Sequence, residues 1–229
     1  ELWLNKMDAR YEIKFILDES KLSKAIQWLL NDTTAIEKYK KRVVNSIYFD
    51  DVDFSSIRDN LAGVSERSKM RLRWYNSKDN SLPIFEVKTR NGRLGSKFSY
   101  PIESLNKKLN ETSLHDITIR CIEDLLSKSI IIDSHIVPTL HVEYEREYFE
   151  THNGIRITVD NSIRFYEPLL YEKVCEGSSL TYPMKVMELK FEKEMKDEVS
   201  KLIQPLNMIP KRHSKYLVGM ASLGHAIYI

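Results

Sequence analysis

The chain has 229 residues, of which 42% are hydrophobic, and its formal net charge at pH 7 is only +2. It is long enough to bury a sizeable core, and its charge is too balanced to attract polyanions in bulk. Any basic site must therefore come from cations gathered in one place. No run of 18 apolar residues and no signal peptide is present, so we expect a cytoplasmic protein with no membrane segment in this chain.

The hydrophobic pattern predicts more strands than helices. Strands are expected, in chain order, over 9–17, 43–49, 68–75, 82–90, 96–102, 139–150, 155–160, 164–170 and 186–192. Helices are expected over 19–30, 53–61 and 114–126, over 194–206, and from Pro210 onward. The short loops between strands favour a mostly antiparallel sheet. No internal repeat or flexible linker divides the chain, which indicates a single domain over residues 1–229.

The stretch from Lys69 to Tyr75 carries the main functional signal. Strand side chains have a period of two, so Lys69, Arg71 and Arg73 fall on one face. Met70, Leu72 and Trp74 fall on the other. Neighbouring cations of this row lie only about 7 Å apart at roughly 3.3 Å per residue. Such a row of positive charge favours a bound anion beside it.

Four other strands repeat this arrangement of charged and bulky apolar faces. Their charged faces carry, in chain order, Arg10, Glu12 and Lys14; Glu86, Lys88 and Arg90; Arg156 and Asp160; and Glu188, Lys190 and Glu192. The apolar faces are too large to leave in water, so helices must cover them. The charged faces then look at one another across a closed or nearly closed sheet. We therefore predict an α+β fold with a barrel whose lumen is polar and basic.

A phosphate chain is the ligand that best fits such a lumen. Like charges about 5 Å apart repel by roughly 3 kcal/mol at an effective dielectric near 20. Phosphate oxygens relieve that repulsion because each accepts charge-assisted bonds, which Arg donates in pairs. The few acids are then either ion-pair partners or ligands for Mg²⁺ or Mn²⁺.

Seven short motifs together resemble one known family, the VTC domain. In chain order they are Arg10-Tyr-Glu12-Ile-Lys14-Phe, Lys69-Met-Arg71-Leu-Arg73-Trp-Tyr, Phe85-Glu86-Val-Lys88-Thr, Tyr144-Glu-Arg146, Ile155-Arg156-Ile-Thr-Val-Asp160, Met187-Glu188-Leu-Lys190-Phe and His213-Ser214-Lys215-Tyr216. The VTC domain is the polyphosphate polymerase branch of the CYTH-like triphosphate tunnel metalloenzymes. The resemblance spans the chain from Arg10 to Gly219. It implies a tunnel of eight antiparallel strands flanked by helices.

The resemblance also implies an activity and a set of site residues. ATP would bind by its triphosphate, and its γ-phosphoryl group would pass to a growing inorganic polyphosphate chain. The implied residues around the transferring group are Arg71, Arg73, Lys88, Arg156 and Lys190. Further implied phosphate ligands are Arg10, Lys14, Lys97, Arg146 and Lys215, to which the basic strand face adds Lys69. Glu188 would hold a divalent metal, Mn²⁺ or Mg²⁺.

Some alternatives remain open from the sequence. Hydrolytic branches usually begin Glu-x-Glu-x-Lys, and Arg10 in place of the first acid favours a polymerase over a tunnel triphosphatase. A non-enzymatic polyphosphate-binding module is a third interpretation. Glu188 could instead pair with Lys190 or Arg71 without any metal. Arg146 shares its parity with apolar residues, which indicates either a bulge or an outward side chain.

Other features have simpler interpretations. We interpret 38–42 as an exposed helix face. The aromatic residues lie opposite the cations rather than among them, which argues against a nucleic-acid partner. Cys121 and Cys175 lack metal-ligand spacing and are typical of a reduced compartment. The chain opens at Glu1 rather than Met, so additional domains or a membrane partner could accompany it.

Overall fold

The computed structural model describes residues 10–76, 82–91, 94–106, 108–132, 135–174 and 176–226. Cys175 and most of the polar loop predicted between the third and fourth strands lie outside these residues. The strands are β1 (Tyr11–Leu17), β2 (Ile36–Asp50), β3 (Glu66–Tyr75), β4 (Ile84–Asn91), β5 (Leu94–Pro101), β6 (Val137–Glu150), β7 (Arg156–Tyr166), β8 (Ser179–Thr181) and β9 (Lys185–Phe191). The α-helices are α1 (Glu19–Asn31), α2 (Ser55–Ala62), α3 (Leu114–Ser127), α4 (Lys196–Ile203) and α5 (Lys215–Ser222).

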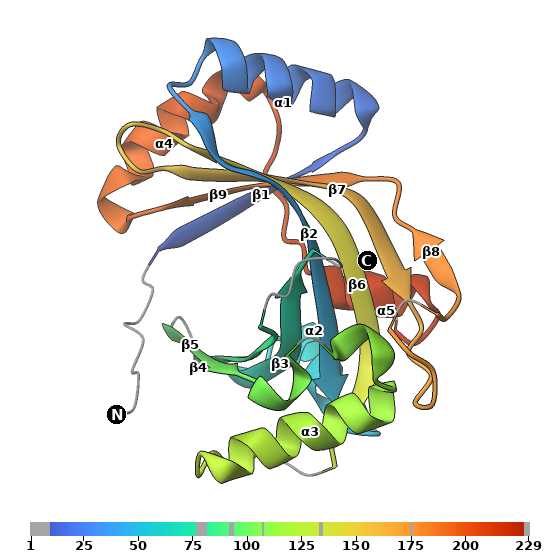
Figure 1. Ribbon diagram of the computed structural model, residues 1–229. Helices are drawn as coiled ribbons and strands as arrows, with labels where there is room; N and C mark the ends of the chain where they lie inside the picture. The colour runs from blue at the N-terminus through green and yellow to red at the C-terminus, as the bar shows by residue number, and fades with distance from the viewer. Residues whose placement is uncertain are drawn as a thin grey trace.

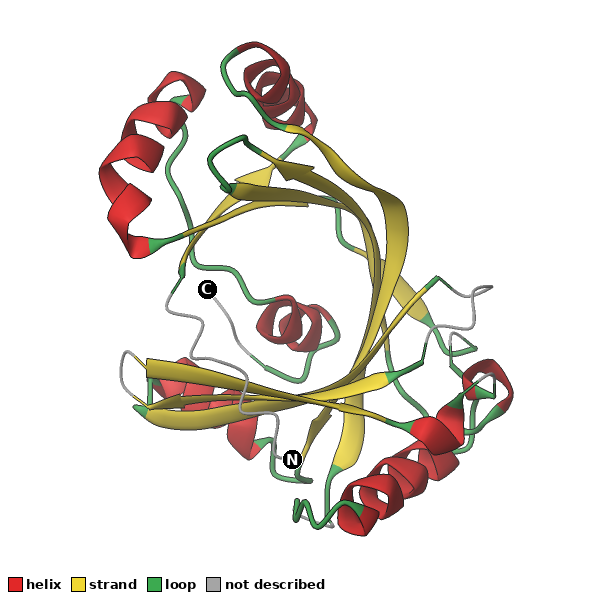
Figure 2. Ribbon diagram, turned by 60° about the vertical axis from the view of Figure 1, so that its left-hand side comes forward, coloured by secondary structure: helices red, strands yellow, loops and turns green. Residues whose placement is uncertain are grey.

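One antiparallel sheet forms the body of the molecule. Its strand order is β1-β9-β7-β6-β2-β3-β4-β5, and the short β8 pairs with β7. The sheet is strongly curved, so that one of its faces is concave, as Figure 2 shows. The predicted α+β fold with an antiparallel, tunnel-like sheet flanked by helices is confirmed. The sheet is not a strictly closed barrel, because its edge strands β1 and β5 do not pair with each other in the described structure.

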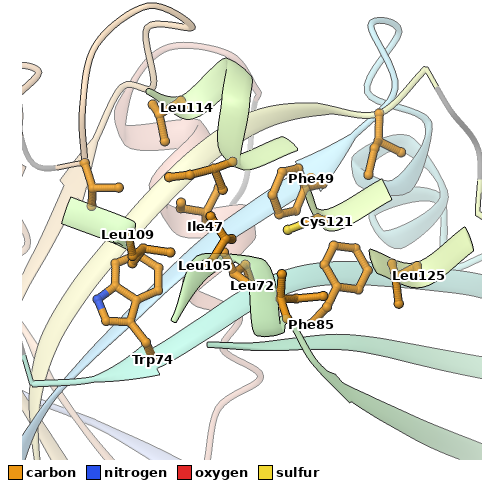
Figure 3. Packing of buried hydrophobic residues seen from close by; sticks show 14 residues of the cluster. Ile47, Phe49, Leu72, Trp74, Phe85, Leu105, Leu109, Leu114, Cys121 and Leu125 are labelled. Carbon is orange, nitrogen blue, oxygen red and sulfur yellow. The ribbon is translucent and has the colours of Figure 1, made fainter. Parts of the chain in front are cut away.

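Helices cover the outer face of the sheet, as the bulky strand faces predicted. On one side, α3 packs on the outer side chains of β2, β3 and β4, including Phe49, Leu72 and Phe85. Figure 3 shows these residues gathered with Cys121 and Leu125 of α3. On the other side, α1 and α4 pack on the outer face of β1, β7 and β9 (Figure 1). The residues left on the inner face are therefore the ones that line the tunnel.

Helix α5 lies inside the curve of the sheet rather than outside it (Figure 2). Its buried side chains, Tyr216, Leu217 and Met220, pack on inner residues of β6 and β7 such as Leu140 and Phe165. The contact is close enough to require glycine at position 219. A Cβ atom there would lie 2.6 Å from Leu140 Cδ2 and 2.8 Å from Phe165 Cδ1. One part of the inner space is thus filled by protein.

Strand β2 corrects one sequence interpretation. Residues 38–42, interpreted as an exposed helix face, are part of this strand. The pattern misled because β2 continues beyond its buried half, so its first seven residues are exposed and carry no apolar alternation. Pairing with β6 stabilises this extension instead, through the ion pairs Lys38–Glu150 and Lys41–Glu145, each 3.0 Å.

Strand β7 also differs from what the sequence predicted. The two strands expected over 155–160 and 164–170 are one strand with a bulge, and this strand ends at Tyr166, so residues 167–170 lie outside it. Ser162 adopts φ 50° at this bulge, and pairing with β6 continues on both sides of it.

Among the described residues, no helix combines the length and the apolar character needed to cross a membrane.

Candidate functional site

The sheet register brings the predicted cations of three strands into rows on the inner face. Lys69 of β3 lies opposite Lys88 of β4, which lies opposite Lys97 of β5. In the next row, Arg71 lies opposite Glu86 on one side and Tyr48 on the other. Directly opposed residues of antiparallel strands have Cβ atoms about 5 Å apart. Groups that are far apart in the sequence are therefore immediate neighbours here.

Glu86 is the acid that balances the arginine row. Its carboxylate accepts from Arg71 Nε at 2.5 Å and also pairs with Lys97. Burial by itself would raise the pKa of Glu86, but Arg71, Arg73 and Lys97 outweigh it and lower the pKa to about 2. Glu86 is therefore ionised at neutral pH and holds Arg71 in place.

The lysine row has less compensation. Lys69 Nζ lies 3.2 Å from Ser214 Oγ, and within the described structure no carboxylate forms an ion pair with Lys69 or Lys88. Burial, together with repulsion from Lys88 and Lys14, lowers the pKa of Lys69 to about 8. Burial and neighbouring cations also lower the pKa of Lys88. An anion bound next to this row would stabilise the charged form of both lysines and raise both pKa values.

A second group of cations lies where α5 begins. Arg146 of β6 forms a bidentate ion pair with Asp160 of β7, at 2.5 and 2.8 Å. Lys215, the first residue of α5, pairs with the same carboxylate and lies 4.6 Å from the centre of the Tyr144 ring. Burial opposes ionisation of Asp160, but Arg146 and Lys215 dominate and lower its pKa to about 2. Asp160 thus positions two of the predicted phosphate ligands.

Arg73 lies between these two groups. Its Nε donates to Ser46 Oγ at 3.0 Å, and its Nη2 donates to Tyr144 Oη at 3.2 Å. Both partners are neutral hydroxyl groups. The charge of Arg73 is therefore available for an anionic ligand to a greater degree than the charge of Arg71 or Arg146.

The remaining acids of the tunnel are Glu12 and Glu188, on the paired strands β1 and β9. Lys14 Nζ lies 2.7 Å from Glu12 and 3.4 Å from Glu188. Lys190 Nζ lies 2.8 Å from Glu188 and 3.8 Å from Glu12. Burial would raise the pKa of Glu188, but Lys190, Lys14 and Arg146 lower it well below its usual range. Two carboxylates and two ammonium groups thus form one compact cluster.

This acidic pair fits a hard divalent cation only together with a substrate. Within the described residues, no group of three or more His, Cys, Asp or Glu side chains could hold a metal. Mg²⁺ and similar ions are, however, commonly held by one or two carboxylates plus phosphate oxygens. Glu188 and Glu12 can supply the first part of such a ligand set. Glu188 also makes the Lys190 ion pair that was its alternative interpretation.

Two predicted ligands lie further out. Arg10, just before β1, pairs with Glu192 at 3.2 Å between the charged groups. Arg156 begins β7 opposite Lys190, and its side chain is 57% exposed. Its nearest acid, Glu150, is 3.9 Å away. These two residues therefore lie at the rim of the cation cluster rather than within it.

The structure also answers the question about Arg146. Its side chain lies on the inner face, and between Leu140 and Arg146 the extra residue of the irregular pairing belongs to the partner strand β7, not to β6. Leu140 and Val142 lie on the same face, and they are apolar there because α5 packs on them. Sequence parity could not reveal this, since it gives no sign that a helix occupies part of the tunnel.

Several polar residues of the site were missed from the sequence. The backbone carbonyl of His213 accepts from Lys14 Nζ at 3.0 Å, so the segment before α5 holds this lysine as well as Lys69. Tyr48 and Tyr144 lie among the cations, which corrects the expectation that the aromatic residues all lie opposite them. Burial would raise the pKa of Tyr48, but Arg71 and Arg73 lower it to about 8. Tyr144 lies two residues from Arg146 and so on the same strand face, and this spacing was the available signal.

The fold and the cation-lined inner face define a protein with a tunnel-like antiparallel sheet. The VTC domain profile matches residues 9–224, and the chain belongs to the VTC domain family. No curated protein matches the chain.

Solved structures with the same fold share little sequence with it. The PH1819 protein of Pyrococcus horikoshii OT3 is 13% identical, with a TM-score of 0.51 over 93% of this chain and 98% of that one. The putative adenylyl cyclase HpAC1 from Hippeastrum, described as having a dominant triphosphatase activity, is 14% identical, with a TM-score of 0.52 over 92% and 95%. A putative adenylate cyclase from Vibrio parahaemolyticus is 11% identical, with a TM-score of 0.51 over 93% and 99%.

Proposed function

We propose that this protein is a polyphosphate polymerase, which transfers the γ-phosphoryl group of ATP to a growing inorganic polyphosphate chain. Membership of the VTC domain family supports this activity. The observation that carries it is the set of inner cations facing one space from β1, β3, β4, β6 and β9. A linear polyanion is the substrate that such an arrangement stabilises best.

Phosphoryl transfer needs alignment and charge neutralisation more than a protein nucleophile. Arg73 has only neutral hydrogen-bond partners, Ser46 and Tyr144, so it is our first candidate for stabilising the transferring group. Arg71, Lys88 and Lys190 would neutralise charge around that group. Lys14, Lys69, Lys97, Arg146 and Lys215 would align the rest of the chain, and Arg10 and Arg156 would act at the rim.

The acids of the site favour transfer to phosphate over transfer to water. A general base that activates water works best with a pKa near the operating pH. Glu86 and Asp160 each have a pKa of about 2, and the pKa of Glu188 is also far below its usual range. None of them is a good base at neutral pH. A terminal phosphate oxygen needs no such activation, because it is already anionic.

A divalent ion, Mn²⁺ or Mg²⁺, would be held by Glu188 with Glu12 and would supply further charge neutralisation at phosphate oxygens. Lys14 contacts Glu12 and Lys190 contacts Glu188, and these ion pairs hold both carboxylates in position. The metal ligands and the phosphate ligands would therefore share one cluster.

A tunnel triphosphatase is the second candidate, and one observation favours it. Lys69 and Tyr48 each have a pKa of about 8, so either group could take a proton from an attacking water molecule near neutral pH. The substrate would then be tripolyphosphate or a nucleoside triphosphate.

The test is incubation with ATP and Mn²⁺, followed by a gel that resolves phosphate chains and a parallel assay for free phosphate. We expect a ladder of products, and loss of about 3 to 4 kcal/mol of transition-state stabilisation in Arg73→Ala. Lys201→Ala, on the exposed side of α4, is the matched control and should retain activity.

Other outcomes would replace the proposal. Free phosphate without a ladder would mean a triphosphatase. Tight phosphate binding with neither product would mean a non-enzymatic binding module.

A further inference from the structure

A group of tyrosines and one arginine lies beside the cation cluster and has no role in the proposed phosphate binding. Arg42 of β2 lies directly opposite Arg146 of β6, so both side chains point to the inner face. The Arg42 guanidinium carbon is 5.4 Å from the centre of the Tyr39 ring and 5.9 Å from that of Tyr75. Within the described residues, no carboxylate forms an ion pair with Arg42.

The position of Tyr39 results from irregular backbone. The strand register shifts between Glu37 and Tyr39 and again between Tyr39 and Arg42. Residues three apart in a regular strand point to opposite faces. The shift between Tyr39 and Arg42 places one extra residue in β2, so Tyr39 lies opposite Tyr148 and on the same face as Arg42. Bulges of this kind redirect side chains and are frequent beside active sites.

The other aromatic residues hold this group in place. Tyr148 meets Tyr39 edge to face, with ring centres 5.8 Å apart. Tyr75 ends β3, where Asn76 exchanges two hydrogen bonds with the backbone of Val43, each 2.9 Å. Tyr39 is nevertheless 52% exposed. Part of a fixed aromatic surface is therefore open to solvent, next to a cation that forms no ion pair within the described residues.

We propose that Tyr39, Arg42 and Tyr75 bind the nucleobase of a nucleotide whose triphosphate lies in the tunnel. Flat aromatic rings and a guanidinium group provide stacking surfaces for a base. Arg42 lies directly opposite Arg146, about 5 Å away across the strand pair. The proposed stacking surface therefore adjoins the phosphate ligands. The proposal rests on the proposed function, because it requires the tunnel to bind a phosphate chain. It makes a nucleoside triphosphate, rather than inorganic polyphosphate alone, the donor.

The test compares ATP with inorganic tripolyphosphate, which has the same number of phosphates and no base. Binding of each is measured by calorimetry, with the same divalent ion, for the wild-type protein and for Tyr39→Ala and Arg42→Ala. Tyr171→Ala removes an exposed tyrosine at a different site and is the matched control. We expect Tyr39→Ala to weaken ATP binding by about fivefold or more, the lower end of base–ring stacking. Its affinity for tripolyphosphate should not change.

The alternatives are separable. If a variant bound ATP and tripolyphosphate equally weakly, the tyrosine–arginine group would be part of the phosphate site, and the base site would be overturned. Unchanged ATP binding in both variants would also overturn it, and would leave the cluster a structural one. If the wild-type protein bound neither ligand, the proposed function would fail first and this inference with it. Tripolyphosphate binding without any preference for ATP would overturn the base site alone.

Discussion

The inner surface of the sheet has two regions whose side chains differ in chemistry, one apolar and one charged. Where α5 lies inside the curve, inner side chains such as Leu140, Val142 and Phe165 are apolar and pack on the helix. In the neighbouring region, inner positions of the strands carry Lys, Arg and a few acids. Both regions follow the same two-residue alternation. The chemistry of an inner face therefore depends on what fills it, a helix or a charged ligand.

The charged region is itself unevenly compensated. Asp160 serves both Arg146 and Lys215, and Glu86 serves Arg71 and Lys97. Lys69 and Lys88 have no such acid in the described structure. The first set of contacts should contribute to stability in the free protein, whereas the lysine row should respond mainly to a bound anion. The experiments below test these differences between regions.

The largest effect is expected from Asp160→Asn. The change leaves Arg146 and Lys215 buried without their shared counter-charge, which typically costs about 3 to 5 kcal/mol. Urea unfolding should show this loss. Asp197→Asn, on the first turn of α4, should change stability little. A loss below about 1 kcal/mol would mean that these cations are already compensated by solvent.

Lowering the pH should produce the same loss of stability gradually. The pKa of Asp160 in the folded protein, about 2, lies below its ordinary value of 3.8. The stability that this group contributes is therefore complete above pH 3.8 and decreases as the pH falls toward 2. Asp160→Asn should have a flatter stability profile in that interval.

Gly219→Ala should test the apolar region. Alanine normally favours a helix over glycine by about 1 kcal/mol, but here its Cβ would overlap Leu140 and Phe165. We expect a net destabilisation of about 1 to 3 kcal/mol from overpacking, measured by thermal unfolding. Ser222→Ala on the same helix controls for helix propensity. A stabilised Gly219→Ala variant would contradict the placement of α5 inside the sheet.

The lysine row should appear in the pH dependence of tripolyphosphate binding. Lys69, with a pKa of about 8 instead of 10.5, carries its charge below pH 8 and loses it above. Affinity should therefore fall as the pH rises through 8, by at most about tenfold per pH unit for one proton. Calorimetry at several pH values would measure it.

Tyr48, also with a pKa of about 8, gains a negative charge in the same interval and acts in the same direction. Lys69→Arg and Tyr48→Phe separate the two groups, and the titration of the ligand itself is common to all variants. If both variants kept the full slope of the wild-type protein, neither group would contact the phosphate chain.

The smallest effect is expected outside the tunnel. Lys41 and Glu145 form an ion pair of 3.0 Å with side chains 51% and 36% exposed. Exposed pairs of this kind contribute about 0 to 1 kcal/mol because water and salt screen them. Lys41→Met should therefore change the urea midpoint only slightly and leave phosphate binding intact. A large loss of phosphate binding would place the Lys41 side chain itself within the phosphate site.

Much of the tunnel could be predicted from local sequence. The alternation in 69–75 correctly separated Leu72 and Trp74, which pack under α3, from Arg71 and Arg73 on the inner face. The period of a strand is a property of the backbone, so a sequence with charged and apolar alternation assigns faces without knowledge of the partner strands. Similar reasoning predicted the antiparallel sheet, and the order of the motifs indicated the family.

The sequence could not determine which groups meet. Glu12 lies beside Glu188, and Ser214 beside Lys69, only because β1 pairs with β9 and the segment before α5 enters the tunnel. The exposed start of β2 lacked apolar alternation and suggested a helix, since its strand form depends on pairing with β6. Likewise, the bulges that move Tyr39 beside Arg42 leave no mark in local composition. Local residues set the period of each strand, whereas long-range pairing and packing set its register, and the register determines the site.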